Sequence, residues 1–368
     1  MTQLADRLKR LVAESGPLTV ANFMALALGH PTEGYYPGRD PLGAEGDFVT
    51  APEVSQLFGE LVGLALAQHW LDMGSPSPVL LVELGPGRGT LMADALRAGR
   101  VAPGFAEAVR VHLVETSPVL RRVQMERLQQ VGPIWHDRLA DVPTDAPMLL
   151  VANEFLDALP IRQFVRLADV WRERVIGLDA DEALAFGLDA RPMSIDAPAP
   201  WAGGGWGQGV VVEFGPAREA AADEIATRLM AQGGLGLVID YGDAGRFTVG
   251  DSLQAVRRHK KVDPLAHPGQ SDLTAHVALG GVATAASATG ATVWGPLPQG
   301  TFLERLGIHQ RVERLARTAT PEQLTALASG FDRLVATEQM GELFKVIAIA
   351  GAPLPVPPGF TDGERWVA

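Results

Sequence analysis

The stretch LLVELGPGRGT, residues 80–90, begins as an apolar run and ends with glycines at every second position. Such a run predicts a buried strand followed by a tight turn into a helix. Glycines let the backbone of this turn approach a bound molecule closely, so the turn is a candidate ligand loop. The alternative is a tight turn that binds nothing. The residues around the loop separate these two interpretations.

Strand and helix signals alternate on both sides of this loop. Strands are expected at residues 79–84, 109–115, 134–135, 148–152, 236–240, 291–294 and 344–350. Helices are expected between them at residues 52–73, 90–98, 117–130, 217–231 and 302–339. This alternation predicts an α/β fold whose parallel strands form a Rossmann-like sheet with helices on both faces.

The remaining segments are expected as additions to this core. We expect an N-terminal helical segment at residues 1–75, the core at 76–160 and 232–350, and an extended tail at 351–368. Closely spaced strand signals at residues 163–176 and 210–214, separated by a long Pro/Gly loop, predict an antiparallel β insertion at residues 161–231, which ends with the helix expected at 217–231. A helical insertion is expected at about residues 299–340.

The composition restricts the class of protein. The 368-residue chain has a net charge of −12, which argues against nucleic acid as a general partner. It has no cysteine, so disulfides, thiolate metal sites and cysteine nucleophiles are excluded. Residues 273–303 lack the sustained apolar run of a membrane span, and the acid-containing N-terminus is unlike a signal or transit peptide. We therefore expect a cytoplasmic protein of bacterial type without membrane insertion.

The loop departs from the dinucleotide fingerprint. Gly85, Gly87 and Gly89 form G-x-G-x-G, whereas G-x-G-x-x-G would require glycine where this chain has Thr90. A nicotinamide oxidoreductase is therefore the weakest alternative. S-adenosylmethionine has no phosphate, and it needs only a close backbone approach to its methionine and ribose parts. This cofactor is the one that we expect.

Three acids near strand ends suit that cofactor. Glu83 precedes the first glycine by two residues, where a carboxylate attracts the amino group of the ligand. Glu115 ends the next expected strand and can accept hydrogen bonds from both ribose hydroxyls, although a nicotinamide enzyme would use it in the same way. Asp137, just past the third strand, is placed either to accept from the adenine amino group or to remain a solvated loop acid.

Long and unusual blocks elsewhere make a family resemblance. Beside VELGPGRGTLMADALR and HLVETSP, the blocks occupy residues 34–63, 153–164, 253–277, 298–311 and 340–348, together with IDYGD. With these blocks the chain resembles the MidA-like methyltransferases, which include a mitochondrial assembly factor for respiratory complex I. The resemblance implies a class I methyltransferase fold that uses S-adenosylmethionine. For the mitochondrial members it implies arginine methylation of a complex I subunit, and hence a protein substrate.

An arginine acceptor favours carboxylates around its guanidinium, because that group stays cationic. Glu154 and Asp157 follow the fourth strand and share one helical face, and Asp240 ends the fifth strand; these three are the candidate catalytic residues. Asn153 is assigned to the cofactor and Tyr241 to the substrate. The alternatives are a helix cap for Asp157 and a strand-end acid tied to backbone amides for Asp240.

The resemblance also implies a lid over the cofactor within the N-terminal segment. There Asp47 is assigned to the cofactor and Glu53 to the substrate. The basic run at residues 257–261 is either a solvated cluster or a contact for an acidic partner, and His259 is assigned to the substrate. No metal is expected, because His259 and His276 lack a third ligand at useful spacing.

The function that these observations favour is an S-adenosylmethionine-dependent protein arginine methyltransferase. Two alternatives stay open: methylation of a small molecule or another side chain, and an assembly chaperone that binds the cofactor without turnover. The sequence also leaves a homo-oligomer open.

Overall fold

The computed structural model describes residues 2–37, 50–168, 170–192, 206–351 and 355–367. Its central feature is a sheet in the order β16-β17-β10-β5-β2-β3-β4. Its strands are β2 (Val79–Leu84), β3 (Val109–Val114), β4 (Ile134–His136), β5 (Met148–Asn153), β10 (Gly234–Asp243), β16 (Thr292–Pro298) and β17 (Phe344–Ala350). The short β15 (Val277–Ala278) pairs with the end of β10. The expected α/β class is confirmed.

Strand order places the glycine loop at a topological switch point. β2 pairs in parallel with β3 on one side and with β5 on the other. The chain therefore goes from β2 to β3 and β4 on one side of the sheet and then crosses to β5 on the other side. β17 is antiparallel to both β10 and β16, whereas the other strands of the sheet run in parallel. In open sheets of this kind, ligands bind outside the carboxyl ends of the strands at the switch point.

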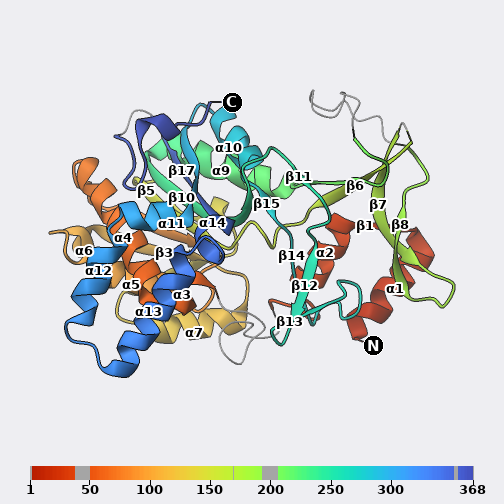
Figure 1. Cartoon of the computed structure of the whole chain (residues 1–368), viewed down its shortest axis with the longest axis horizontal. Helices are drawn as coiled ribbons and strands as arrows, with labels where there is room; N and C mark the ends of the chain where they lie inside the picture. The colour runs from red at the N-terminus through yellow and green to blue at the C-terminus, as the bar shows by residue number, and fades with distance from the viewer. Residues whose placement is uncertain (1, 38–49, 169, 193–205, 352–354, 368) are drawn as a thin grey trace.

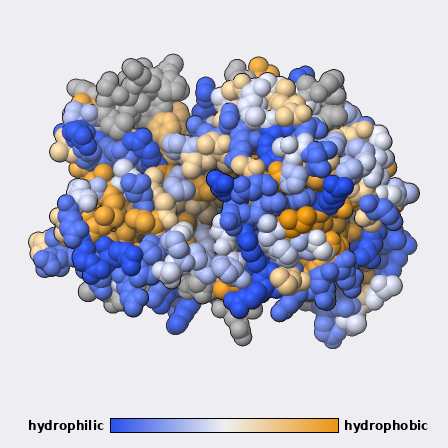
Figure 2. All heavy atoms as spheres, turned by 180° about the vertical axis from the view of Figure 1, so that it is seen from behind, coloured by the Kyte–Doolittle hydropathy of each residue, from blue (hydrophilic) through white to orange (hydrophobic). Residues whose placement is uncertain are grey.

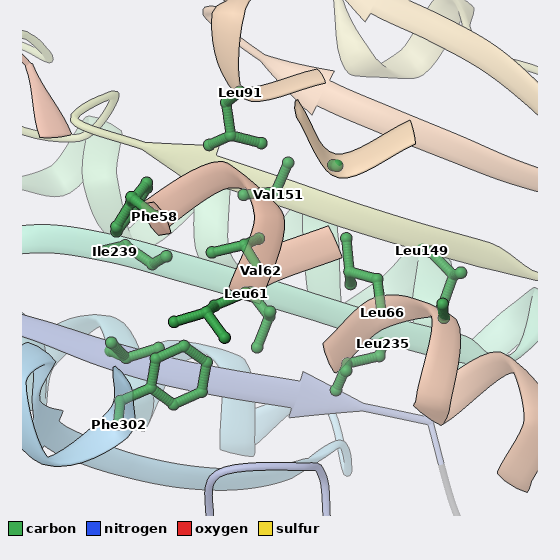
Figure 3. Packing of buried hydrophobic residues seen from close by; sticks show 14 of the residues in the cluster. Phe58, Leu61, Val62, Leu66, Leu91, Leu149, Val151, Leu235, Ile239 and Phe302 are labelled. Atoms are coloured by element: carbon green, nitrogen blue, oxygen red, sulfur yellow. The ribbon is translucent and has the colours of Figure 1, made fainter. Parts of the chain in front are cut away.

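Helices cover both faces of the sheet because its strands are apolar on both sides. In β2, Leu81 packs into one hydrophobic cluster while Leu80 and Val82 pack into the other. One face is covered mainly by α4 (Gln56–Asp72), α5 (Thr90–Gly99) and α6 (Phe105–Ala108), and the other by α9 (Pro216–Gln232) and α10 (Leu279–Ala288). Figure 3 shows Leu61, Val62 and Leu66 of α4 against Leu149, Val151, Leu235 and Ile239 of β5 and β10.

The remaining helices border this core. α3 (Ala51–Val54) leads into α4, and α7 (Pro118–Leu128) connects β3 to β4. The C-terminal group comprises α11 (Gln299–Arg305), α12 (Ile308–Ala316), α13 (Pro321–Val335) and α14 (Met340–Leu343). The described residues also form the 3-10 helices η1 (Leu139–Asp141) and η2 (Asp362–Glu364). The C-terminal group packs on the α4 face through residues such as Phe302 and Ile308.

A second body, which we call the small lobe, lies beside the core (Figure 1). It contains α1 (Gln3–Ser15), α2 (Val20–Gly29) and the sheet β1-β7-β6-β9-β11, in which β8 also pairs with β7. Those strands are β1 (Leu18–Thr19), β6 (Arg162–Leu167), β7 (Val170–Leu178), β8 (Leu184–Leu188), β9 (Val211–Phe214) and β11 (Thr248–Val249). A three-stranded sheet adds β12 (Gln254–Arg257), β13 (Lys260–Val262) and β14 (Asp272–Thr274).

The small lobe joins segments that are far apart in the sequence. Leu4, Phe23, Ile176 and Leu273 belong to one buried cluster, so both N-terminal helices pack with the inserted strands. α3 and α4 belong instead to the core cluster through Ala51 and the buried face of α4. The domain boundaries drawn from the sequence stay predictions. The packing shows which parts of the N-terminal segment each body contains.

The strands predicted at residues 79–84 and 344–350 are confirmed at both ends. The single helix predicted at 52–73 is wrong in one respect, because Ser55 has an extended backbone with φ of −160° and divides it into α3 and α4. The helix α2 and strands β8 and β11–β14 were not predicted. Among the described residues, no helix is long and apolar enough to span a membrane.

Candidate functional site

The glycine loop follows β2 and leads into α5. Gly85, Gly87 and Gly89 have φ angles of 61°, 52° and 74°, a left-handed region that favours glycine. Gly89 is the N-cap of α5, and it makes no side-chain cap bond. The alternating glycines therefore turn the chain sharply at the switch point and leave backbone at the surface of the loop.

A cavity of about 570 Å³ lies beside this loop, within the size range of small-molecule sites. Its polar wall comes from the carboxyl ends of the core strands, and its apolar wall includes residues of α2 in the small lobe. Seen from behind, the surface is notched between the two lobes (Figure 2). Of the predicted site residues, the cavity is lined by Glu53, Glu83, Gly85, Gly87, Glu115, Asp137, Asn153 and Glu154.

Glu83 and Glu115 form a buried acidic pair at the ends of β2 and β3. Burial, reinforced by Glu115, raises the pKa of Glu83 to about 8. Burial also raises the pKa of Glu115, although the Ser117 amide donates to its Oε1 over 2.7 Å. Oε2 of Glu83 is buried and finds no hydrogen-bond partner among the described residues. A ligand with a cationic amino group and vicinal hydroxyls fits these carboxylates.

A hydrogen-bond network on α7 holds the ribose-side acid. Nε2 of Gln124 donates to Oε2 of Glu115 over 3.2 Å and to the Gly87 carbonyl over 2.6 Å. The Trp135 indole donates to Oε1 of Gln124 over 2.8 Å. Gln124 therefore links the glycine loop to β3 and β4. This role was not predicted, because the sequence does not distinguish one amide on a polar helix from a solvated residue.

Asp137 lies at the edge of the same cavity. Its Oδ1 accepts from Arg121 over 2.7 Å, and its side chain is 74% exposed. Arg121 also donates to the carbonyl of His136 over 3.1 Å. The side chain of Asp137 is therefore solvated, as one of the two sequence interpretations expected, and it also lines the cavity.

Asn153 and Glu154 project from the end of β5. Oε1 of Glu154 accepts from the Ala51 amide over 3.0 Å and from Nδ2 of Asn153 over 3.1 Å. Burial raises the pKa of Glu154 to about 7. Its φ of 49° is unusual for a residue with a side chain, and strain of this kind concentrates at functional sites. Oδ1 of Asn153 is buried and finds no partner among the described residues.

Asp157 and Asp240 do not line the cavity, so their assignment as catalytic residues stays a prediction. Oδ2 of Asp240 accepts from the amides of Leu156 and Asp157 over 2.9 and 3.1 Å. Oδ1 accepts from the amide of Tyr241 over 2.9 Å. These bonds fit the alternative of a strand-end acid, and they fix the turn that carries Glu154.

Tyr241 belongs to the same buried layer rather than to the cavity wall. Burial and then Asp157 raise the pKa of its phenol, and hydrogen bonds to Thr274 and Gln254 oppose this shift. Arg218 crosses the layer and donates to four backbone carbonyls, among them that of Asp157 over 3.0 Å. The layer therefore supports the cavity wall from behind, and the assignment of Tyr241 to the substrate stays a prediction.

The remaining predicted residues have different positions. Glu53 lines the cavity, accepts from the Thr90 hydroxyl and lies 3.7 Å from Arg127. Asp47 lies outside the described residues. His259 is in the turn between β12 and β13 and does not line this cavity, so its assignment to the substrate stays a prediction. Among the described residues, no group of three His, Asp or Glu side chains could hold a metal ion.

The sheet order, the acid–glycine loop and the acid at the end of the neighbouring strand define a class I S-adenosylmethionine-dependent methyltransferase fold. A family described as "Putative S-adenosyl-L-methionine-dependent methyltransferase" matches residues 61–297. The chain belongs to this family, and S-adenosylmethionine is its cofactor. The resemblance seen in the sequence is thereby confirmed.

Several relatives match most of the chain. It is 37% identical over 377 residues to the mitochondrial protein arginine methyltransferase NDUFAF7 homolog of Drosophila melanogaster, covering 94% of this chain and 84% of that protein. It is 34% identical to mitochondrial protein arginine methyltransferase NDUFAF7 of Homo sapiens, covering 95% and 83%. These relatives are mitochondrial, which contradicts the expected cytoplasmic location of bacterial type; that prediction was wrong.

A solved structure shares the whole architecture. A protein from Burkholderia thailandensis, crystallised with S-adenosyl-homocysteine, superposes with a TM-score of 0.86 at 28% identity. The match covers 98% of this chain and 94% of that chain. A native crystal structure from the same organism gives a TM-score of 0.82 at 29% identity. The bound product-like ligand in the first structure agrees with the cofactor expected from the glycine loop.

Proposed function

We propose that this methyltransferase transfers a methyl group to arginine in a partner protein. The observation that carries the proposal is Glu154, a carboxyl group that lines the cavity at the end of β5 in a strained backbone conformation. The curated relatives are protein arginine methyltransferases, which supports the same acceptor. The resemblance to the MidA-like family points to a subunit of respiratory complex I as the partner.

When bound, the cofactor supplies a methyl group on a positively charged sulfur. On the protein side, we assign Glu83 to its amino group, Glu115 to its ribose and Asp137 to its adenine. Gly85 and Gly87 supply a close backbone approach, whereas Gly89 does not line the cavity and caps α5. We also assign Asn153 to the cofactor, because it lines the cavity and its buried Oδ1 accepts no hydrogen bond from the described residues.

Glu154 is the group that we assign to the guanidinium. The Ala51 amide and Nδ2 of Asn153 both donate to Oε1, so we assign Oε2 to the hydrogen bond with the acceptor. A guanidinium in the cavity favours the ionised carboxylate and lowers the pKa of Glu154 from its value of about 7. The ionised carboxylate then orients the acceptor nitrogen and takes up the proton that methylation releases.

Asp157 and Asp240 act as positioning residues in this proposal. Asp240 holds the turn after β5 through the amides of Leu156 and Asp157. Loss of these bonds would displace Glu154 without removing any group from the cavity. We therefore expect Asp240→Asn to lower kcat and leave the affinity for S-adenosylmethionine nearly unchanged.

The test is transfer of radiolabelled methyl groups from S-adenosylmethionine into a lysate that lacks this protein. Label in acid-hydrolysed protein as methylarginine is the expected result, and Glu154→Gln should abolish it while retaining cofactor binding. Label only in small molecules would overturn the protein acceptor. Full function of Glu154→Gln in cells would favour a chaperone that needs no turnover. Mass spectrometry of complex I subunits then tests the partner.

A further inference from the structure

One wall of the cavity comes from α2, a helix of the small lobe that has no part in the glycine loop. Met24, Ala25, Leu28 and Gly29 line the cavity from this helix. Met24 and Leu28 are buried, whereas Ala25 and Gly29 are exposed. Ala25 and Gly29 are four residues apart and therefore share one face of α2. Small residues on an exposed face beside a cavity leave room for a ligand.

Hydrogen bonds hold α2 in place beside the cavity. After α2 the chain turns back, and the amides of Tyr35 and Tyr36 donate to the carbonyls of Ala27 and Leu28 over 3.0 and 3.1 Å. The Tyr36 hydroxyl donates to Oδ1 of Asp272 in β14 over 2.9 Å. Tyr36 itself lines the cavity. The α2 wall is thus tied to the three-stranded sheet, and it has a defined position relative to the rest of the small lobe.

The cavity is lined by residues from both bodies. Glu83 and Glu115 of the core suit the cofactor. The segment after β5 lies between them and α2, because Phe155 lies beside Gly85 while Ala158 lines the cavity on the α2 side. Ala158 packs in the same hydrophobic cluster as Met24 and Leu28, so these walls adjoin. Glu154 stands directly before this apolar segment in the chain.

We propose that the α2 face is the acceptor wall, with Gly29 as the residue that sets how wide an acceptor side chain can enter. This inference rests on the proposed function and names the fit of its substrate. The aliphatic stem of an arginine packs against Ala25 and Gly29, and its cationic head reaches Glu154. Long cationic side chains bury their methylenes in this way while the charged head keeps a polar partner.

A substitution of Gly29 can test the acceptor wall without disturbing the fold. A Cβ atom added there meets nothing within 4 Å, and the backbone is outside the left-handed region. A larger side chain is therefore expected to fill acceptor space without straining the fold. Gly177 in β7 is the matched control, because its added Cβ also meets nothing within 4 Å and it does not line the cavity.

The experiment compares Gly29→Ala, Gly29→Leu and Gly177→Leu with the wild type. Calorimetry measures the Kd for S-adenosylmethionine, and radiolabelled transfer measures initial rates over a concentration series of lysate protein. We expect Gly29→Leu to lower transfer by about tenfold to 100-fold, as for overpacking of a fitted site, and Gly29→Ala by less. Cofactor Kd and Tm should stay at wild-type values in all three variants, as should transfer by Gly177→Leu.

The outcomes separate this inference from the function on which it rests. Wild-type transfer of label into protein, with undiminished transfer by Gly29→Leu, overturns the acceptor wall alone. A loss of cofactor affinity in Gly29→Leu that matches its loss of transfer also overturns it, because α2 would then border the cofactor. A wild-type enzyme that labels only small molecules overturns the protein acceptor, and with it the arginine stem.

Discussion

Burial of Glu83 beside Glu115 makes a carboxyl group whose charge depends on what occupies the cavity. Its raised pKa, about 8, means that the side chain is mostly protonated at neutral pH in the cofactor-free protein. A cationic ligand group next to it favours the carboxylate instead. This one residue therefore links cofactor binding, proton release and the stability of the fold.

The stability of the fold should depend on pH through Glu83. The folded pKa of Glu83 is above its ordinary value of 4.5, so the folded chain holds a proton that the unfolded chain releases between about pH 4.5 and pH 8. Its contribution to stability is complete below pH 4.5 and is lost as the pH rises through 8. The free energy of unfolding of Glu83→Gln, measured with urea, should therefore exceed that of the wild type increasingly from pH 6 to pH 8.5. A constant difference would contradict the assigned shift.

The affinity for the cofactor should also depend on Glu83. Glu83→Gln keeps the size of the side chain but removes the charge that attracts the amino group. A hydrogen bond to a charged group contributes about 1.5–3 kcal/mol, so the Kd for S-adenosylmethionine should rise by about tenfold to 100-fold. Isothermal titration measures this. Wild-type binding should also release protons at pH 7, detected in buffers of different ionisation enthalpy, and the variant should release fewer.

At this scale the sequence predicted the acids but not their partners. Glu83 and Glu115 stand at strand ends next to a conspicuous glycine pattern, and strand ends meet at one edge of a parallel sheet. Gln124 and Tyr36 reach the site from a polar helix and from a turn. Nothing local distinguishes such residues from solvated ones. For Asp240 the sequence offered the bonds to backbone amides as an alternative, but it did not indicate that the amides belong to Leu156 and Asp157 after β5.

Among the elements, β2 was predictable because burial on both faces gives it six consecutive buried residues. The short strands β12 to β14 were not, since they have three or four residues each and little periodicity. The C-terminal helices were recognised by their pattern. Their contact with the core adds to the apolar packing one buried carboxylate, which the pattern does not reveal.

That carboxylate, Glu60 of α4, gives the third prediction. It is 1% exposed, Arg311 of α12 contacts both of its oxygens at 2.7 and 2.8 Å, and Arg97 of α5 donates over 2.9 Å. These arginines lower the pKa of Glu60 against the effect of burial. Removing one partner of a buried ion pair costs about 3–5 kcal/mol. Because both arginines keep some exposure, we expect Glu60→Ala to lower the free energy of unfolding towards the lower end of that range.

Chemical denaturation measures this loss. The matched control is Arg191→Ala, which removes an exposed pair with Asp189 at 3.5 Å and should cost less than about 1 kcal/mol. A Glu60→Ala protein as stable as the control would show that the ion pairs do not hold α12 against α4 and α5.

On the scale of the whole molecule, the cavity lies where two bodies meet. The sequence predicted the core, because its strands and helices alternate along the chain. It did not predict that α1 and α2 pack with strands of residues 162–188 and 254–274, because such long-range pairing leaves no local pattern. The acceptor wall of the cavity was missed for the same reason.

This arrangement gives the fourth prediction, for hydrogen exchange. S-adenosyl-homocysteine lacks the methyl group and leaves the acceptor wall uncovered, so it should protect amides at the ends of β2 and β3 and at the start of α5. Amides of α2 should exchange as in the free protein. At about 100 times its Kd the ligand should add about 2.7 kcal/mol to the free energy of unfolding. This gain slows the exchange of every amide that exchanges only on global unfolding. Exchange is therefore compared under native conditions, where local opening dominates in loops and helix ends. Protection of α2 equal to that of the glycine loop would show that the cofactor extends to the acceptor wall.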